Sequence, residues 1–214
     1  MLPCLHQLLS NDRKGIRKET CWTLSNITAG SKDQLQAVID HGIIPVLVHM
    51  LETEDFDIRK ECAWAISNAT SGGDDLQIKY LVDNGCVPPL VNLLDKPDVR
   101  IVSVALEGIE NILKCGQRNL NADGTNPFVA VVEMAQGVDR IEDLQRHENH
   151  KIYDMAVKIL ENYFGVDDDE VCVCIYICGG CQAGLCAGVC VVSVCLCVSV
   201  CLCVSGCLCV CVCV

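Results

Sequence analysis

The sequence predicts an all-α protein in which similar three-helix units stack as a solenoid. The run ETCWTLSN at 19–26 returns 42 residues later as ECAWAISN at 61–68. The flanking residues repeat as well, since HGIIPVLV at 41–48 is answered 43 residues later by NGCVPPLV at 84–91. A unit of this length buries its apolar face by stacking on its neighbours, so we expect no single central core.

The first helix of each complete unit is predicted over 31–41 and 74–84. Each segment is followed by a glycine, Gly42 or Gly85, which suits the left-handed position that closes a helix. Ser31 followed three residues later by Gln34 fits a capping box. These signals set the boundaries of the repeated first helix.

A short apolar second helix is predicted over 44–51 and 87–94, followed by a longer third helix that carries the repeated runs. Pro45 and Pro88 fall in the first turn, where no amide hydrogen is needed. A three-helix unit of about 42 residues lies in the armadillo and HEAT range of roughly 40 to 47 residues.

Four units are expected, of which the first is truncated and the last is divergent: 2–29, 31–70, 74–115 and 127–164. In the fourth unit, helical apolar spacing predicts helices over 138–145 and 153–160. The polar, glycine-containing stretch 119–126 predicts a loop. Asn126 followed by Pro127 predicts a cap and a first-turn proline.

The composition divides the chain near residue 170. The formal net charge of −12 arises entirely before residue 171, because no Asp, Glu, Lys or Arg follows. Such an acidic body counts against nucleic acid as a direct partner and favours basic ligands. Its cysteines lie in or beside apolar helical runs, and no signal peptide precedes them, which favours a reducing cytoplasmic or nuclear compartment.

We therefore expect a repeat domain over 1–164, an acidic linker over 165–170 and a low-complexity Cys/Val tail over 171–214. As an uncharged apolar stretch, the tail is long enough for a membrane anchor. Its Cys-x-Cys pairs are compatible with soft-metal binding. An alternating TG tract in DNA also encodes Cys-Val repeatedly, and we favour this explanation of a translated repeat, in which the tail is disordered or irregular.

The repeated polar triplet is the candidate binding device. Its acid, indole and amide fall at i, i+3 and i+7, which places them on one helical face. The amide can hydrogen-bond a peptide main chain, the indoles can hold a Lys or Arg stem with a cation–π contribution, and the acid can receive the charged end. The six candidate residues are Glu19, Trp22, Asn26, Glu61, Trp64 and Asn68, here called the Glu/Trp/Asn array.

Alternatively, each residue of the triplet has only a structural role: the Trp lies in the core, the Asn ends a helix and the Glu is solvated. If this alternative holds, the chain is a scaffold of the armadillo or HEAT type without peptide binding. Catalysis is not expected, because the sequence shows no Ser/His/Asp set, phosphate-binding glycine loop or HExxH motif. His147 and His150 are three residues apart without further ligands and suit a helix end. No cofactor or metal is expected.

At these residues the sequence resembles the importin-alpha family, armadillo adaptors that carry proteins with basic nuclear-localisation signals. The matching runs are IRKETCWTLSNITAG, RKECAWAISNATSGG, DNGCVPPLVNLL and RIEDLQRHENHKIYDMAVKILENYFG. The resemblance covers residues 2–170 and implies a right-handed superhelix located in cytoplasm and nucleus. It also implies that Trp22 and Trp64 form the basic side-chain slots of the smaller signal site. Asn26 and Asn68 would bind the peptide main chain, and Glu19 and Glu61 its basic groups.

Departures from the family pattern limit the expected partners. The third unit keeps Asn111 but has Glu107 at the Trp position and Val104 at the Glu position, so the array is expected to end after unit two. The family's importin-beta-binding segment has no counterpart here, so importin-beta is not expected as a partner. Residues 127–170 match the region that engages an export receptor. The acidic run stops at Glu170, however, which counts against that partner.

Overall fold

The computed structural model describes residues 1–165 and the pairs 201–202 and 208–209. The regular elements of the first compact unit, Met1–Gly165, are all helices. Its elements are α1 (Leu2–Leu8), α2 (Lys14–Thr28), α3 (Lys32–Asp40), α4 (Ile43–Thr53), α5 (Phe56–Gly72), α6 (Asp75–Asp83), α7 (Val87–Val91), α8 (Val99–Arg118), α9 (Val129–Met134), α10 (Gly137–Asp143), the 3₁₀ helix η1 (Leu144–Arg146) and α11 (His150–Tyr163).

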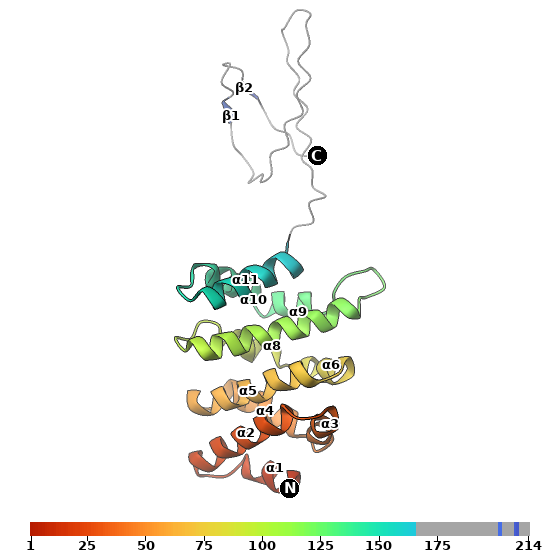
Figure 1. The fold of residues 1–214 in the computed structure, drawn as a ribbon, viewed down its shortest axis with the longest axis vertical. Helices are drawn as coiled ribbons and strands as arrows, with labels where there is room; N and C mark the ends of the chain where they lie inside the picture. Colours follow the sequence, from red (N-terminus) through yellow and green to blue (C-terminus); the bar gives the residue numbers. More distant parts are fainter. Residues whose placement is uncertain (166–200, 203–207, 210–214) are drawn as a thin grey trace, which may run out of the picture. The chain divides into compact units, whose positions relative to one another are not determined.

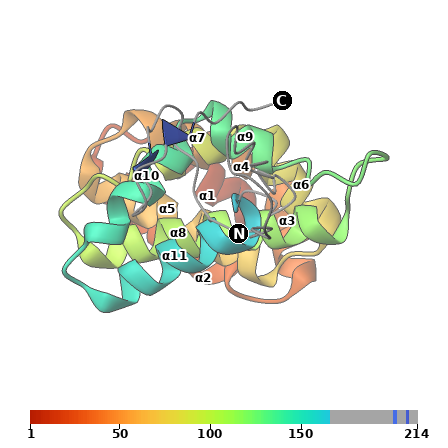
Figure 2. The same ribbon diagram turned by 90° about the horizontal axis from the view of Figure 1, so that it is seen from above.

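The long helices α2, α5, α8 and α11 lie one above another along the stack (Figure 1). Seen along the stack, α2, α8 and α11 lie on one side of this unit and α4, α7 and α9 on the other (Figure 2). The first, third and fourth layers therefore present their third helices to the same side. The prediction of an all-α repeat solenoid with a truncated first unit is confirmed, since α1 and α2 stand where later layers have three helices.

Polar caps begin the first helices of the two complete units. Ser31 Oγ accepts from the amide of Gln34, whose Oε1 accepts from the Ser31 amide at 2.8 Å, so the predicted capping box is present. Asp74 and Gln77 form the same device at the start of α6, which sequence analysis missed. A carboxylate replaces the hydroxyl there, and both accept the orphan amide hydrogens of the first turn.

Glycines close the same two helices in the left-handed conformation. Gly42 has φ of 65° and Gly85 has φ of 78°, as their positions predicted. A side chain at either position would strain the backbone, because only glycine adopts these angles freely. The turns that direct α3 into α4 and α6 into α7 are thereby fixed locally.

The second helix of unit three is shorter than predicted. Residues 87–94 were expected to be helical, but α7 ends at Val91. Beyond it, the amides of Leu93 and Leu94 bond to the carbonyls of Leu90 and Val91, three residues back. The chain thus tightens into 3₁₀-type turns, which satisfy the last carbonyls of a short helix.

The fourth unit differs most from expectation. The loop over 119–126 is present, but Pro127 does not begin a helix. Instead, Asn126 Oδ1 accepts from the Phe128 amide at 3.0 Å in a local turn, and the unpredicted helix α9 starts at Val129. Six residues without a polar cap give too weak a periodicity to be recognised. The other two expected helices correspond to α10 with η1 and to a longer α11.

A continuous row of aliphatic side chains forms the core between the layers. Leu24, Leu47, Ile66, Leu90 and Ile109 are all fully buried and come from five successive second and third helices. Because the row crosses the boundaries between the first three layers, each of these units stabilises its neighbours, as stacked repeats require.

Hydrogen bonds between polar side chains join the end of α8 to the start of α6 in unit three. Arg118 at the end of α8 bonds Asp75 at the start of α6, and Asn119 Nδ2 donates to Asp75 Oδ2 at 2.8 Å. These hydrogen bonds, with the Arg118 bond contributing most, lower the pKa of Asp75 to about 2.

We therefore expect acid to weaken the interaction between Asp75 and Arg118. Since the folded pKa of Asp75 lies below its ordinary value of 3.8, its contribution to stability is complete above about pH 4 and is lost as pH falls through 2. Unfolding by urea, followed by circular dichroism between pH 5 and 2, should show a shallower pH dependence for Asp75→Asn and for Arg118→Gln than for the unchanged chain. Equal slopes in all three chains would contradict the assignment.

Two short strands are described outside the first unit. They are β1 (Cys201–Leu202) and β2 (Leu208–Cys209), which pair antiparallel with Cys201 opposite Cys209. The rest of the predicted acidic linker and of the tail lies outside the described residues, as do the anchor and metal-binding alternatives for it. Within the described residues, no single helix is long and apolar enough to cross a membrane. The pair α3 and α4 meets the length and composition test only together, with a bend of 82°.

Candidate peptide-binding surface

Helices α2 and α5 pack side by side with their repeated runs in register. Cys21 Sγ lies 3.6 Å from Cys62 Sγ, and both side chains are fully buried between the helices. The hydrogen bond that Cys62 donates to Cys21, together with burial, raises the pKa of the Cys62 thiol. One helical turn later, Asn68 Nδ2 donates to the Ser25 carbonyl at 3.0 Å. The two triplets therefore stand on neighbouring layers at matching heights along their helices.

Both indoles of the array are open to solvent. Trp22, on α2, is 54% exposed and Trp64, on α5, is 40% exposed, although they adjoin fully buried residues on the same helices. Large aromatic side chains usually bury most of their surface, so two exposed indoles at the same repeat position are informative. The reading of these residues as core tryptophans is wrong.

The two asparagines of the array differ in their anchoring. Asn26 is exposed, and its Nδ2 donates to the Trp22 carbonyl of its own helix at 3.0 Å. Asn68 is half-buried and reaches across to α2. Each Asn amide carries two donor hydrogens and an acceptor oxygen, so each keeps hydrogen-bonding capacity beyond these single bonds.

The two acids of the array carry no ion pair within residues 1–165. Glu19 is exposed and Glu61 is half-buried. Lys60, the sequence neighbour of Glu61, is 3.7 Å from Asp98 and 3.9 Å from Asp57, and its ammonium lies over the Phe56 ring. Lys60 is thus engaged at the start of its helix, and within residues 1–165 it forms no ion pair with Glu61.

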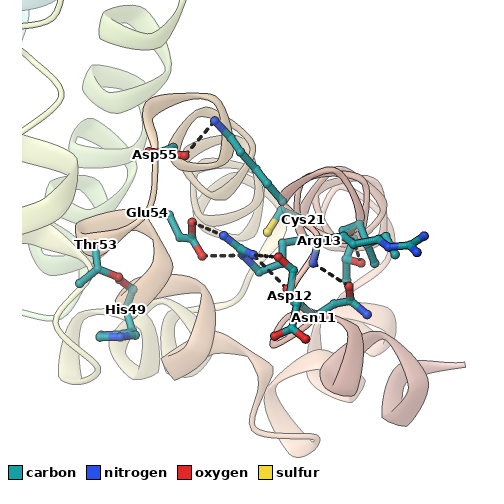
Figure 3. A network of polar contacts seen from close by, with 12 residues as sticks. Asn11, Asp12, Arg13, Cys21, His49, Thr53, Glu54 and Asp55 are labelled. Atoms are coloured by element: carbon teal, nitrogen blue, oxygen red, sulfur yellow. Dashed lines mark hydrogen bonds and ion pairs between the residues drawn. The ribbon is translucent and has the colours of Figure 1, made fainter.

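Ion pairs beside the array hold the first two layers together (Figure 3). Arg17 on α2 forms two bonds, of 2.7 and 3.0 Å, to the Glu54 carboxylate that follows α4. Lys14 is 2.8 Å from Asp55. The Glu54 hydrogen bond raises the pKa of Arg17, and the Lys14 hydrogen bond lowers the pKa of Asp55, so each contact favours the charged form of these two groups. Their partners lie 37 and 41 residues apart in the chain, so the local sequence does not predict these pairs.

The third layer presents a different set of groups. Asn111 Nδ2 donates to Ser71 Oγ at 3.0 Å, so α8 reaches back to α5 much as α5 reaches α2. Val104 is buried, and the Glu107 carboxylate lies 3.0 Å from Lys151 Nζ on α11. Lys151 was missed because nothing in its local sequence marks it. Only its pairing 44 residues away reveals it.

Comparison with known families agrees with the repeat structure. Residues 1–29, 31–71 and 74–114 match the armadillo/beta-catenin-like repeat, and residues 126–173 match the atypical Arm repeat. These segments cover most of the chain. The first three have nearly the boundaries of the first three predicted units, whereas the fourth begins at 126 and extends past the predicted end at 164 to residue 173. Armadillo chains of this kind are binding scaffolds rather than enzymes.

Curated relatives are named importin subunit alpha. Importin subunit alpha-1a of Oryza sativa subsp. japonica is 59% identical over 79% of this chain and 33% of its own length. Importin subunit alpha-4 of Arabidopsis thaliana is 54% identical over 76% of this chain and 31% of its own length. The chain thus spans about a third of these relatives.

Solved structures of engineered proteins share the fold. A designed armadillo repeat protein in complex with the peptide (KR)4 has a TM-score of 0.64 and 32% identity, covering 75% of this chain and 63% of that one. Computationally designed armadillo repeat proteins for modular peptide recognition have a TM-score of 0.53 and 25% identity, covering 76% of this chain and 82% of theirs. With its armadillo repeats, its relatives and its doubled Glu/Trp/Asn triplet, the chain belongs to the importin-alpha family.

Proposed function

We propose that this chain is an adaptor segment for nuclear import, which binds basic nuclear-localisation signals of cargo proteins through the Glu/Trp/Asn array. The observation that carries the proposal is the pair of solvent-exposed indoles, Trp22 and Trp64, at the same repeat position of adjacent helices. An extended basic peptide lying across α2 and α5 would place a Lys or Arg stem against these rings.

The chemistry of the array suits such a ligand. A cation over an indole face gains about 0.5 to 2 kcal/mol, depending on how far it is desolvated. The carboxylates of Glu19 and Glu61, which lack an ion pair within residues 1–165, can receive the charged end. Asn26 and Asn68 can bond the peptide main chain through their remaining groups. The net charge of −12 draws a cationic ligand toward the chain.

Two comparisons support the same ligand class. The relatives are named importin subunit alpha, and a designed protein of the same fold was solved in complex with an alternating Lys-Arg peptide. A segment of this kind would act in cytoplasm and nucleus. Engagement of an export receptor by residues 127–170, and the division into repeats over 1–164, linker over 165–170 and tail over 171–214, stay predictions.

Fluorescence titration tests the proposal directly, because the two tryptophans of the array are the only ones in the sequence. A Lys/Arg-rich peptide is expected to change the emission saturably at low salt. The affinity should fall as salt is raised, since the Debye length contracts from about 30 Å at 0.01 M to about 8 Å at 0.15 M. A peptide of equal length with Gln in place of Lys and Arg is the control.

A titration without change in emission and without binding at low salt would remove the proposal. The scaffold alternative predicts the same affinity for the basic and the Gln peptide, or none for either. The two readings are therefore separated by the preference for positive charge.

A further inference from the structure

The position that holds an indole in the first two layers holds an acid in the third. Glu107 follows Trp64 by 43 residues, the repeat distance, and precedes Asn111 as Trp64 precedes Asn68. Asn111 bonds Ser71 across the α5 and α8 boundary, which keeps the third layer in line with the array. A peptide that continues along the stack from Trp64 would next meet Glu107.

Of the three acids Glu19, Glu61 and Glu107, only Glu107 forms an ion pair within residues 1–165. Glu107 Oε1 lies 3.0 Å from Lys151 Nζ, with side chains 45% and 64% exposed. Within residues 1–165, Glu19 and Glu61 carry no such partner. The Lys151 ammonium therefore pairs with Glu107 in the way that a cation of the ligand would pair with Glu19 or Glu61.

The Lys151 contact is weak enough to be displaced. An ion pair between exposed side chains contributes about 0 to 1 kcal/mol, because water screens it and both side chains lose freedom. A second pair between α8 and α11 is better protected. Glu110 is mostly buried, and its Oε1 lies 2.8 Å from Lys158 Nζ and 2.9 Å from Lys114 Nζ. Burial alone would raise the pKa of Glu110, but the two lysines together lower it. Loss of Lys151 would thus leave the helix contact in place.

We propose that Glu107 is a third cation-binding position of the peptide-binding surface, and that Lys151 occupies it as an internal competitor which limits the bound signal to the two indole layers. This inference rests on the proposed function. Neighbouring helices lie about 8 to 10 Å apart, and an extended chain advances about 3.3 Å per residue. The competing ligand residue would therefore be a Lys or Arg about three positions beyond the residue held at Trp64.

The test uses the full chain and three peptides measured by calorimetry. One is a core peptide that carries only the basic pair for the indole layers. The other two add a lysine three residues before or three residues after that pair. Lys151→Ala should increase the affinity for one of the two extended peptides by about 2- to 5-fold relative to its effect on the core peptide, which is the range that one exposed ion pair allows. Which of the two extended peptides gains affinity, the one with the lysine before the basic pair or the one with it after, also shows the direction in which the peptide lies on the surface.

Lys158→Ala is the matched control, since it removes the same charge from the same helix while Lys114 still holds Glu110. It should affect all three peptides alike. Adding Glu107→Gln to Lys151→Ala should abolish the selective gain.

Equal responses of the two lysine variants, or a gain that survives Glu107→Gln, would overturn the inference while leaving the proposed function intact. Failure of the core peptide to bind the unchanged chain would overturn both.

Discussion

Replacing both indoles, Trp22→Ala with Trp64→Ala, is expected to weaken binding of a basic peptide by about 1 to 4 kcal/mol, roughly 5- to 1,000-fold. Each indole face contributes about 0.5 to 2 kcal/mol to a held cation, and the exposed rings lie where a ligand reaches them. Because these rings are partly solvated already, the free energy of unfolding should fall by less than about 1 kcal/mol for each substitution.

The double variant lacks tryptophan, so binding is measured by the fluorescence anisotropy of a labelled peptide. Tyr153→Ala is the control, because Tyr153 is an aromatic residue of α11 that is 41% exposed and outside the array. Its affinity should match that of the unchanged chain. A double variant that binds the basic peptide as well as this control does would refute the array as the binding site.

Ile66→Ala, only two residues from Trp64, should instead destabilise the fold by about 2 to 5 kcal/mol. Ile66 is fully buried in the continuous core, and truncation removes packed atoms and leaves a cavity that stacked helices refill only in part. The loss should extend to neighbouring layers, since each unit depends on the next. Urea unfolding followed by circular dichroism measures it.

Leu76→Ala is the matched control for the core substitution. Leu76 is 79% exposed on α6, so truncating it leaves no cavity and should cost within about 0.5 kcal/mol. If Ile66→Ala cost no more than this control, the division of α5 into a buried face and a ligand-facing indole would be wrong.

Local chemistry explains why much of the fold could be predicted. A capping box at Ser31 and left-handed glycines at Gly42 and Gly85 act within a few residues, so their signals are complete in the sequence. The early end of α7 and the short helix α9 were not predicted, because both depend on turns whose hydrogen bonds form only in the packed unit.

The candidate site was likewise predictable from the sequence only in part. The array residues were recognisable because an acid, an indole and an amide repeat at fixed offsets, which core packing does not require. Their exposure could not be read from that pattern. The same helical positions would have suited a buried tryptophan.

The sequence by itself determined the number of repeats, the capping box at Ser31, the closing glycines Gly42 and Gly85, and the identity of the six array residues, because periodicity and capping are local properties of the chain. Only the tertiary structure decided which charges remain free. Within residues 1–165, Glu61 is left without an ion pair, whereas Glu107 receives Lys151 from 44 residues away. Pairing depends on which side chains adjacent layers bring within a few ångströms, and stacking sets that distance.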